Sequence, residues 1–334
     1  MEGMDTSEQG ALTAARDDER AFRSLVEPYR RELRAHCYRM SGSIHDADDL
    51  VQESMLRAWR GLSSFEGRAS LRTWLHRVTT NACLDALEKK SARVLPRELG
   101  PAADPRTPMA PDAEIPWLEP CPDALIDDAP MSPEARYDAR ESVALAFLTA
   151  LQHLPPRQRA VLLLRDVLGH EASECAELLE TSVASVNSAL QRARETLAQR
   201  PKSDRPPQDE TTSALLARYV TAWERADVGL LVSILREDAT LAMPPFASWL
   251  SGRDDIGAAI AAMVFVPGAS GNISLVPTRA NGEPAFAMYT RDPESGQMRA
   301  SAIHVLTIRD GAIAAVDAFL DPSLFESFGL PATR

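Results

Sequence analysis

The chain has 334 residues, of which 45% are hydrophobic and 25% are charged, and its formal net charge at pH 7 is -12. This composition is that of an ordinary globular protein, and it excludes globally disordered, collagen-like and mucin-like chains. The length favours two or three domains over one. No run approaches the roughly 18 apolar residues that a membrane-spanning helix needs, and the acidic N-terminus lacks the pattern of a secretory signal. We therefore expect a cytoplasmic protein that does not enter a membrane.

The cysteines are few and widely separated. None of them forms a CxxC motif or has a histidine at the spacing of a zinc site. We expect reduced, structural thiols, no disulfide, no metal and no cofactor. The four residues are Cys37, Cys83, Cys121 and Cys175.

Charge is segregated along the chain. Residues 1–19 carry one arginine against six acids, and we expect them to form a flexible acidic N-terminus. Residues 20–97 have a net charge of +6, whereas residues 98–141 have a net charge of -8. A basic first domain can bind phosphates even though the whole chain is acidic.

The first folded segment, residues 20–95, has the apolar spacing of amphipathic helices. Val51, Met55, Ala58 and Leu62 recur at helical intervals, and a second series begins at Leu71. The segment between these helices, residues 63–70, has the composition of a loop. Ser70 is placed to cap the helix that follows it.

Proline and charge mark two linkers. Ten prolines fall between residues 96 and 133 in an acidic stretch that cannot form a continuous helix, so we expect a linker over residues 96–140. A second Pro-rich stretch predicts a shorter linker over residues 201–210.

Residues 141–200 also read as helical, with breaks at Pro155-Pro156 and at Leu168-Gly169-His170. Two apolar faces separated by Glu180-Thr-Ser predict a helix-turn-helix. The second helix turns short polar groups and an arginine outward, which suits contact with base edges and phosphates. An ordinary helical hairpin with a solvated face explains the same pattern. The outward residues are Ser185, Asn187, Ser188, Gln191 and Arg192.

Residues 211–330 change character. Two amphipathic helical segments precede runs that read as strands, among them residues 301–308 and 312–319. Arg309-Asp-Gly is a tight hairpin signal between those two runs. Helices followed by an antiparallel sheet predict an α+β domain.

Two motifs resemble those of a known family. The first reads Asp46-Ala-Asp-Asp-Leu-Val-Gln-Glu-Ser-Met-Leu-Arg-Ala-Trp-Arg and continues through Phe65-Glu-Gly-Arg-Ala-Ser-Leu-Arg-Thr-Trp-Leu-His-Arg-Val-Thr-Thr-Asn-Ala-Cys-Leu-Asp. It resembles the second conserved region of sigma-70-type factors of the extracytoplasmic-function group. The second, Leu154-Pro-Pro-Arg-Gln-Arg-Ala-Val-Leu-Leu-Leu-Arg-Asp-Val-Leu-Gly, is similar to their fourth region and leads into the helix-turn-helix. Two such motifs in this order are far more specific than either alone.

The resemblance implies a set of binding residues in the second region. An acidic face would dock on a basic coiled coil of the largest catalytic polymerase subunit, although an isolated acidic helix face is more often simply solvated. A neighbouring helix and loop would contact the -10 promoter element, with Phe65 beside a flipped base or, equally, in the core. The expected polymerase-binding residues are Asp46, Asp49, Gln52 and Glu53. The expected -10 residues are Phe65, Arg72, His76, Arg77, Thr80 and Asn81.

The fourth region would read the -35 element through the outward face of its helix-turn-helix. Related recognition helices often read Val-Lys-Ser-Arg-Leu, whereas this chain has Val186-Asn-Ser-Ala-Leu. Asn187 and Ala189 thus replace two cations. We expect weaker phosphate anchoring and an altered -35 preference.

The linker of this family passes through the RNA channel of the polymerase, which suits an acidic strand. An apolar island, Ile115-Pro-Trp-Leu-Glu-Pro, interrupts the linker. We expect it to dock on a partner or on the C-terminal domain.

The C-terminal segment resembles the ketosteroid-isomerase-like (SnoaL-like) domains that are fused to some sigma factors. The expected fold class is therefore multidomain, with two all-α sigma domains and a cone-shaped α+β domain that has a curved antiparallel sheet. Such a domain offers a concave pocket. No spacing there demands catalysis, so a regulatory role is favoured over an enzymatic one. The candidate pocket residues are Trp223, Phe246, Trp249, Tyr289, His304 and Asp317.

The leading hypothesis is a transcription initiation factor without enzymatic chemistry. Its partners would be core RNA polymerase and promoter DNA, and its appended domain would regulate it through a small ligand or an intramolecular contact. The main alternative is an isomerase-like or small-molecule-binding protein whose helical half is only a tether. A repressor that binds DNA without polymerase is a weaker third possibility.

Overall fold

The computed structural model describes residues 6–67, 69–88, 90–107, 109–125, 142, 144–198 and 210–334. The chain divides into two compact units. The first unit contains residues 1–92 and 125–201, and the second contains residues 93–124 and 202–334. The expected boundary after residue 95 is thus close, but the first part of the expected linker belongs to the second unit. The rest of that linker, 126–140, and residues 201–209 lie outside the described residues.

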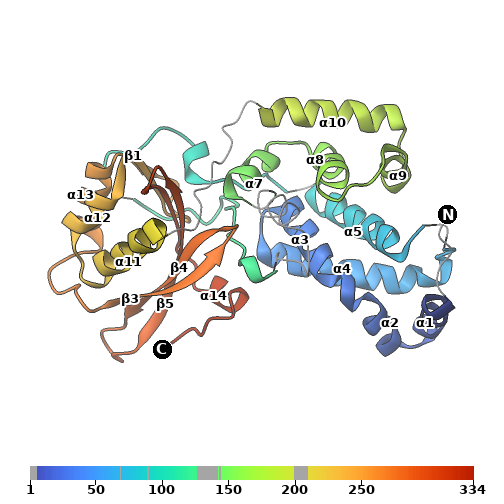
Figure 1. The fold of residues 1–334 in the computed structure, drawn as a ribbon, viewed down its shortest axis with the longest axis horizontal. Coiled ribbons are helices and arrows are strands. Elements are labelled where there is room, and N and C mark those ends of the chain that lie inside the picture. Colours follow the sequence, from blue (N-terminus) through green and yellow to red (C-terminus); the bar gives the residue numbers. More distant parts are fainter. Residues whose placement is uncertain are drawn as a thin grey trace. The chain divides into compact units, whose positions relative to one another are not determined.

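The first unit is helical throughout its described part (Figure 1). Its N-terminal half contains α1 (Thr6–Asp17), α2 (Glu19–Val26), α3 (Arg30–Ser41), α4 (Ile44–Gly61) and α5 (Leu71–Leu87). Short 3-10 turns cover Glu27–Tyr29 and Leu62–Ser64. Its C-terminal half contains α7 (Leu145–Gln152), α8 (Pro156–Leu162), a π-helical turn (Leu163–Val167), α9 (Ala172–Leu178) and α10 (Val183–Ala198).

Local sequence explains where these helices begin and end. The hydroxyl of Ser43 accepts a hydrogen bond from the backbone amide of Asp46 and caps the start of α4. The hydroxyl of Ser70 accepts a hydrogen bond from the backbone amide of Thr73, which confirms the predicted cap of α5. Gly42 ends α3 at a φ of 74°, a left-handed conformation that favours glycine. Pro156 occupies the first turn of α8, where its missing N–H costs no hydrogen bond.

The N-terminus differs from expectation. Residues 6–17 form the helix α1 instead of a flexible tail, and α1 packs against α2. The reason is a short apolar stripe, because Leu12 and Ala15 are buried although the segment is acidic overall. Two apolar residues three positions apart lie on one face of a helix and suffice to dock it.

The second unit is built on a six-stranded sheet with the order β2-β1-β6-β5-β4-β3. The strands are β1 (Leu235–Ala242), β2 (Trp249–Ser251), β3 (Ile273–Ala280), β4 (Glu283–Arg291), β5 (Met298–Arg309) and β6 (Ala312–Phe319). Neighbouring strands are antiparallel except for β1 and β6, which are parallel and so depart from the antiparallel sheet that we expected. The predicted hairpin turn between β5 and β6 is present, with Asp310 and Gly311 both at positive φ.

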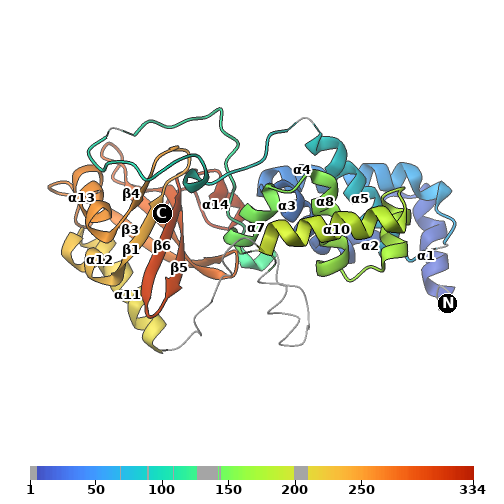
Figure 2. The ribbon, with the colours of Figure 1, turned by 90° about the horizontal axis from the view of Figure 1, so that it is seen from above.

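Helices cover one face of this sheet (Figure 1 and Figure 2). They are α11 (Glu210–Glu224), α12 (Val228–Ile234) and α13 (Arg253–Met263), and a short α14 (Leu324–Ser327) packs near β5. The core lies between helices and strands and includes Tyr219, Trp223, Ile260, Phe286 and Leu306. This is the predicted α+β fold, a curved sheet that does not close into a barrel.

In the described part of the chain, no helix combines the length and the hydropathy needed to cross a bilayer.

Candidate functional site

The acidic face of the first unit lies on α4. Asp49 and Gln52 are exposed, and Asp46 and Glu53 are half-buried on the same helix. Asp46 accepts a hydrogen bond from Lys90 at 3.0 Å, and Glu53 accepts one from Arg57 at 2.8 Å. All four predicted polymerase-binding residues are therefore on one helix, with Asp49 and Gln52 the most accessible.

Two large apolar side chains extend this face, and the sequence analysis did not include them. Leu56 is 47% exposed and Trp59 is 38% exposed, although both belong to the amphipathic helix α4. The helical spacing of the sequence was enough to predict their exposure, because neither residue falls on the buried face formed by Val51, Met55 and Ala58. Leu56 and Trp59 thus add exposed apolar area beside the acidic residues of α4.

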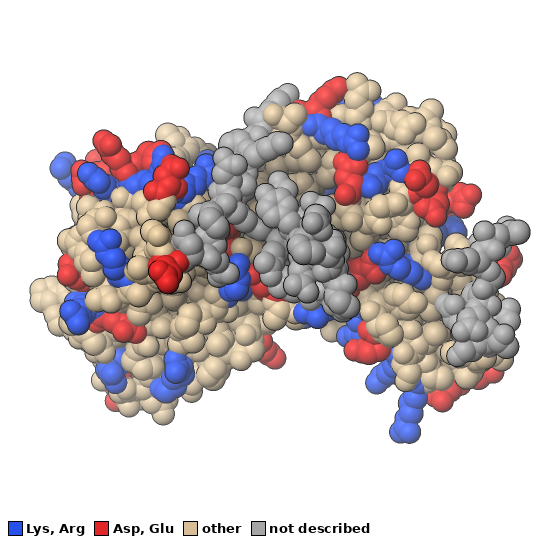
Figure 3. Space-filling model, in the orientation of Figure 1, with Lys and Arg blue, Asp and Glu red and all other residues tan. Residues whose placement is uncertain are grey.

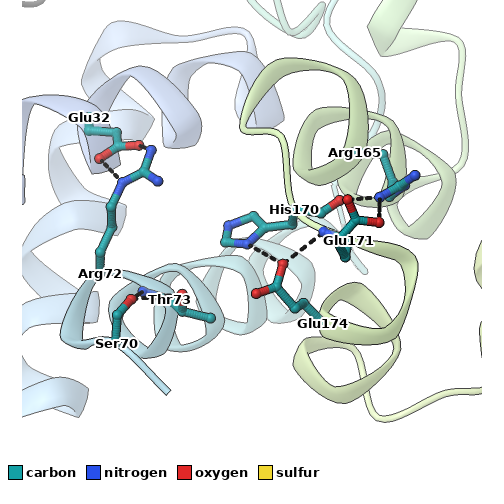
Figure 4. Close-up of polar contacts among 8 residues, drawn as sticks. All are labelled: Glu32, Ser70, Arg72, Thr73, Arg165, His170, Glu171 and Glu174. Carbon is teal, nitrogen blue, oxygen red and sulfur yellow. Dashed lines mark hydrogen bonds and ion pairs between the residues drawn. The ribbon is translucent and has the colours of Figure 1, made fainter. Parts of the chain in front are cut away.

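Some of the predicted -10 residues on α5 are buried, and the two arginines among them are bound to glutamate side chains. His76 and Thr80 are buried, Asn81 is half-buried, and Arg72 and Arg77 are exposed. Arg72 binds both carboxylate oxygens of Glu32, as Figure 4 shows, with its Nε 2.9 Å from Oε2. Arg77 donates to Glu180 at 2.8 Å.

Phe65, the remaining -10 candidate, is buried in the loop before α5. Its ring lies 5.1 Å from that of Trp74, and its carbonyl accepts a hydrogen bond from Arg16 of α1 at 3.5 Å. Of the two roles left open for this residue, the structure shows packing in the loop.

Glu32 is the electrostatic centre of this region. Burial alone would raise the pKa of Glu32, but its contacts with His76 and Arg72 outweigh burial and lower that pKa to about 2. The carboxylate is therefore ionised at any physiological pH and holds Arg72 in place.

The predicted helix-turn-helix is present. α9 and α10 are joined by a turn in which Glu180 has a φ of 50°, and the Ser182 hydroxyl caps α10 by accepting the amide of Ser185. Val186, Leu190 and Ala193 are buried, whereas Val183 is 43% exposed and leaves the expected apolar face. The predicted -35 residues, all exposed on α10, are Ser185, Asn187, Ser188, Gln191 and Arg192.

Arg159 joins the two halves of the first unit. It is buried and donates to the carbonyl of Met40, to both oxygens of Gln152 at 2.8 and 3.1 Å, and to the carbonyl of Leu154 at 3.2 Å. Burial lowers the pKa of Arg159 to about 10, so the guanidinium remains charged at neutral pH. In this arrangement α5 packs against α8 and α9. This packing explains why part of the predicted -10 surface is covered.

Charges of both signs are mixed on the face of the molecule that Figure 3 shows. Figure 3 shows Lys and Arg side chains interspersed with Asp and Glu on the visible face. Ion pairs within the first unit take up several of its cations, including Arg57, Arg72 and Arg77. The positive net charge of the segment therefore does not form one continuous basic field on that face.

The first part of the expected linker, up to residue 124, is an integral part of the second unit. Near its start, Arg97 donates to the hydroxyl of Thr240 at 3.0 Å and forms an ion pair of 2.8 Å with Asp317, which is 2% exposed. The indole of Trp249 donates to the carbonyl of Gly100 at 2.8 Å, and the amide of Ala103 donates back to Trp249. These contacts attach the linker to β1, β2 and β6.

The linker is attached again at residues 121–123. Cys121 and Asn281 exchange two hydrogen bonds of 2.9 Å. The Asp123 carboxylate accepts the amide of Gly282 at 2.6 Å and the guanidinium of Arg279 at 2.9 Å. Between the two attachments, Trp117 of the apolar island forms a β-bridge with Val94, just before the linker, and Leu118 is fully buried.

Asp123 offers a test of this attachment. Asp123→Ala should lower the free energy of unfolding of the second unit by about 2 kcal/mol, because a buried charge-assisted pair of hydrogen bonds is lost. Thermal unfolding of the full chain, with hydrogen exchange at residues 121 and 282, measures the change. The exposed Asp104→Ala is the matched control, with an expected cost of about 0.5 kcal/mol or less. Equal effects of both variants would contradict a structural role for Asp123.

The pocket candidates of the second unit do not converge on one site. Trp223 and His304 lie together in the core, with ring centroids 4.7 Å apart. Trp249 and Asp317 contact the linker instead, and Phe246 forms a bridge to Pro111 of the linker. Tyr289 lies under the C-terminal segment, where its hydroxyl donates to the carbonyl of Pro331 at 2.9 Å.

The buried histidine in the core is neutral at physiological pH. Burial lowers the pKa of His304 to about 3, and its Nδ1 is 2.9 Å from the hydroxyl of Tyr219. Among the described residues, no group of three His, Cys, Asp or Glu side chains is arranged to hold a metal ion.

Comparisons with known proteins place three family models on this architecture. A model described as Sigma-70 region 2 matches residues 25–93, one described as Sigma-70, region 4 matches residues 144–197, and one described as a SnoaL-like domain matches residues 216–316. These limits fall on α2–α5, on α7–α10, and on the helices and sheet of the second unit.

Relatives match over nearly the whole chain. The ECF RNA polymerase sigma factor SigG of Mycobacterium tuberculosis is 48% identical over 318 residues, which is 93% of this chain and 84% of that protein. The ECF RNA polymerase sigma factor SigJ of the same species is 28% identical over 93% of this chain and 95% of its own length. The crystal structure of M. tuberculosis SigJ superposes with a TM-score of 0.60 at 24% identity, covering 92% of this chain and 99% of that one. This likeness supports the fold.

Proposed function

The chain belongs to the ECF RNA polymerase sigma factors, and from this premise we propose how its residues serve transcription initiation and how its second unit regulates it. Core RNA polymerase and promoter DNA are the partners that membership of this family implies. We propose further that the protein works in the cytoplasm and catalyses no reaction of its own.

We assign polymerase binding to the exposed face of α4. Asp49 and Gln52 are accessible there, and Leu56 and Trp59 add apolar area beside them. Charged groups at such an interface give orientation and association rate, whereas desolvated apolar groups give affinity. Asp46 and Glu53 are in the same surface and would exchange their partners Lys90 and Arg57 for polymerase groups.

We assign -35 recognition to the exposed face of α10 and -10 recognition to α5 with its preceding loop. Asn187 and Gln191 can read base edges, and Arg192 can neutralise phosphate. On α5, Arg72 and Arg77 are exposed but paired with Glu32 and Glu180. DNA binding at α5 would therefore require Arg77 to leave Glu180.

The proposal of regulation by the second unit rests on one observation, the attachment of the linker to the sheet domain at residues 97 and 123. Arg97 is held by Asp317, and Asp123 is held by Arg279. In this family the linker normally passes through the polymerase. A linker retained on the sheet is unavailable for that path, so we propose that the second unit restrains initiation by retaining it.

Transcription of sheared genomic DNA tests the initiation role. Core polymerase should produce a defined set of new 5′ ends when the chain is added, and these starts should share -10 and -35 sequences. Absence of any start that depends on the chain would contradict the assignment.

Weakening the two attachments tests the regulatory role. Asp317→Asn combined with Asp123→Asn should raise the yield of those transcripts about threefold or more, since an ion pair and charge-assisted hydrogen bonds are lost. Asp310→Asn removes an exposed charge from the pair with Arg236 and is the control. Hydrogen exchange over residues 94–125 reports whether the linker is released. A released linker with unchanged transcript yield would contradict regulation through retention.

A further inference from the structure

Three histidine rings form a buried row in the first unit. His36 on α3 lies 5.5 Å from His76 on α5, and His76 lies 5.8 Å from His170, measured between ring centroids. Their exposed fractions are 1%, 0% and 5%. His36 and His76 belong to region 2, whereas His170 precedes α9 in region 4. The row therefore crosses the contact between the two regions, and Figure 4 shows His170 directed toward the region 2 helices.

Some of the histidine ring nitrogens at this contact lack hydrogen bonds to the described residues. Nδ1 of His76 and Nε2 of His170 are buried and have no hydrogen-bond partner among the residues that the structure describes. His36 differs, because its Nε2 is 3.0 Å from the hydroxyl of Thr80 within region 2. A histidine with a buried, unpartnered nitrogen is held by packing, and packing alone does not compensate a positive charge.

Charged groups surround the row on every side. From α3 come Glu32 and Arg39, and from α5 comes Arg72. From region 4 come Glu174 on α9, whose carboxylate is 3.6 Å from Nδ1 of His170, and Arg165, which donates to the carbonyl of His170 and contacts Glu171. The carboxylate of Glu32 contacts both Arg72 and His76, and its Oε1 lies 3.2 Å from Nε2 of His76.

The balance of these groups disfavours a charge on His170. Burial lowers the pKa of His170, and the neighbouring His76 and Arg72 lower it further, while Glu174 acts in the opposite direction. Glu174 is half exposed at its side chain, so solvent screens its contribution. Burial also places the pKa of His36 well below its ordinary value. His36 lies inside region 2, and its titration concerns that region alone.

We propose that His170 is a proton-sensitive latch, and that its protonation separates region 4 from region 2 and exposes the surface of α5 that carries His76. The latch uses the packing of α5 against α8 and α9, and the pair between Arg77 and Glu180 bridges the same contact. The opening itself does not depend on the proposed function, which concerns only what the exposed surface then binds.

The direction of the pH effect follows from the linkage between proton binding and the equilibrium of the open and closed states. A histidine whose pKa is lower in the closed state than in the open state stabilises the closed state at high pH, and that stabilisation is lost as the pH falls below the open-state value of about 6.5. Between that pH and the closed-state pKa, the ratio of open to closed molecules should rise about tenfold per pH unit for the single proton on His170.

A distance measurement on the full chain tests the latch. All four native cysteines are buried, so a thiol-reactive spin label will attach to cysteines introduced at two exposed positions, Arg60→Cys on α4 and Ala184→Cys on α10. We expect one short distance at about pH 8 and a longer, broader distribution at about pH 5.5. An unchanged distribution at the lower pH would overturn the proposal.

Two substitutions of His170 separate charge from packing. His170→Gln cannot take up a proton and should remain closed at both pH values, whereas the amine of His170→Lys is protonated at both pH values once it is exposed, so this variant should be open at both. The exposed His153→Gln is the control and should respond as the parent does. If His170→Gln opens at about pH 8, or still opens on acidification like the parent, the proton on His170 is not the trigger. Far-UV circular dichroism establishes that each variant is folded.

Discussion

Arg159→Leu should lower the free energy of unfolding of the first unit by about 3 kcal/mol or more. Leucine replaces part of the buried volume but donates no hydrogen bond, so the carbonyls of Met40 and Leu154 and both oxygens of Gln152 lose their donor. Each buried acceptor left without a partner costs about 1 to 3 kcal/mol, and relaxation of the structure keeps the total below the sum. Urea denaturation with hydrogen exchange at α3 and α8 measures the change.

The neighbouring Arg157 supplies the control for this result. It lies on the same helix but is exposed, so Arg157→Leu removes the same charge without leaving buried acceptors unpaired. Its expected cost is about 0.5 kcal/mol or less. A cost for Arg159→Leu below about 1 kcal/mol would mean that water replaces the guanidinium and that the contact between regions 2 and 4 does not depend on it.

Asp49→Arg should weaken binding of the chain to core RNA polymerase about tenfold or more. The side chain is exposed on α4, so reversing its charge will leave the fold intact while placing a cation against the basic surface of the polymerase that we propose this face contacts. Biolayer interferometry with immobilised core enzyme measures the affinity. The loss should shrink as salt is raised, because screening weakens the new repulsion.

Glu88→Arg is the matched control for the polymerase contact. It makes the same charge change at an exposed position at the end of α5, outside the α4 face. We expect its affinity for core polymerase to stay within about twofold of the parent. Equal losses for the two variants would indicate that net charge, and not the α4 face, controls binding.

Local signals in the sequence predicted much of the fold. Ser70 caps α5 as expected, the breaks at Pro155-Pro156 and Gly169 separate helices, and Asp310-Gly311 forms the turn between β5 and β6. These features depend on residues close in the chain, where side-chain hydrogen bonds and allowed backbone angles determine the outcome. The helix-turn-helix and the α4 face were predicted for the same reason, together with the family motifs.

Features that depend on distant residues were not predictable in this way. The parallel pairing of β1 with β6 joins segments about 75 residues apart, and nothing local distinguishes it from an antiparallel neighbour. His76 has a polar side chain on an amphipathic helix, and only the packing of region 4 shows that it is buried. In the described part of the linker, up to residue 125, the prolines agree with the lack of an α-helix, but they said nothing about the surface on which this segment lies.

Segments of the two units alternate along the chain, so deleting the C-terminal segment affects more than the residues that are removed. Because residues 93–124 fold with residues 202–334, removing the C-terminal segment also strips the linker of its binding surface. Leu118, Cys121 and Pro122, all buried in the intact chain, would then face water. A truncated protein would therefore expose this apolar linker segment between its DNA-binding regions. Aggregation through the exposed segment would then be one cause of any lost activity. Point substitutions at the attachment sites keep the surface in place and report on retention alone.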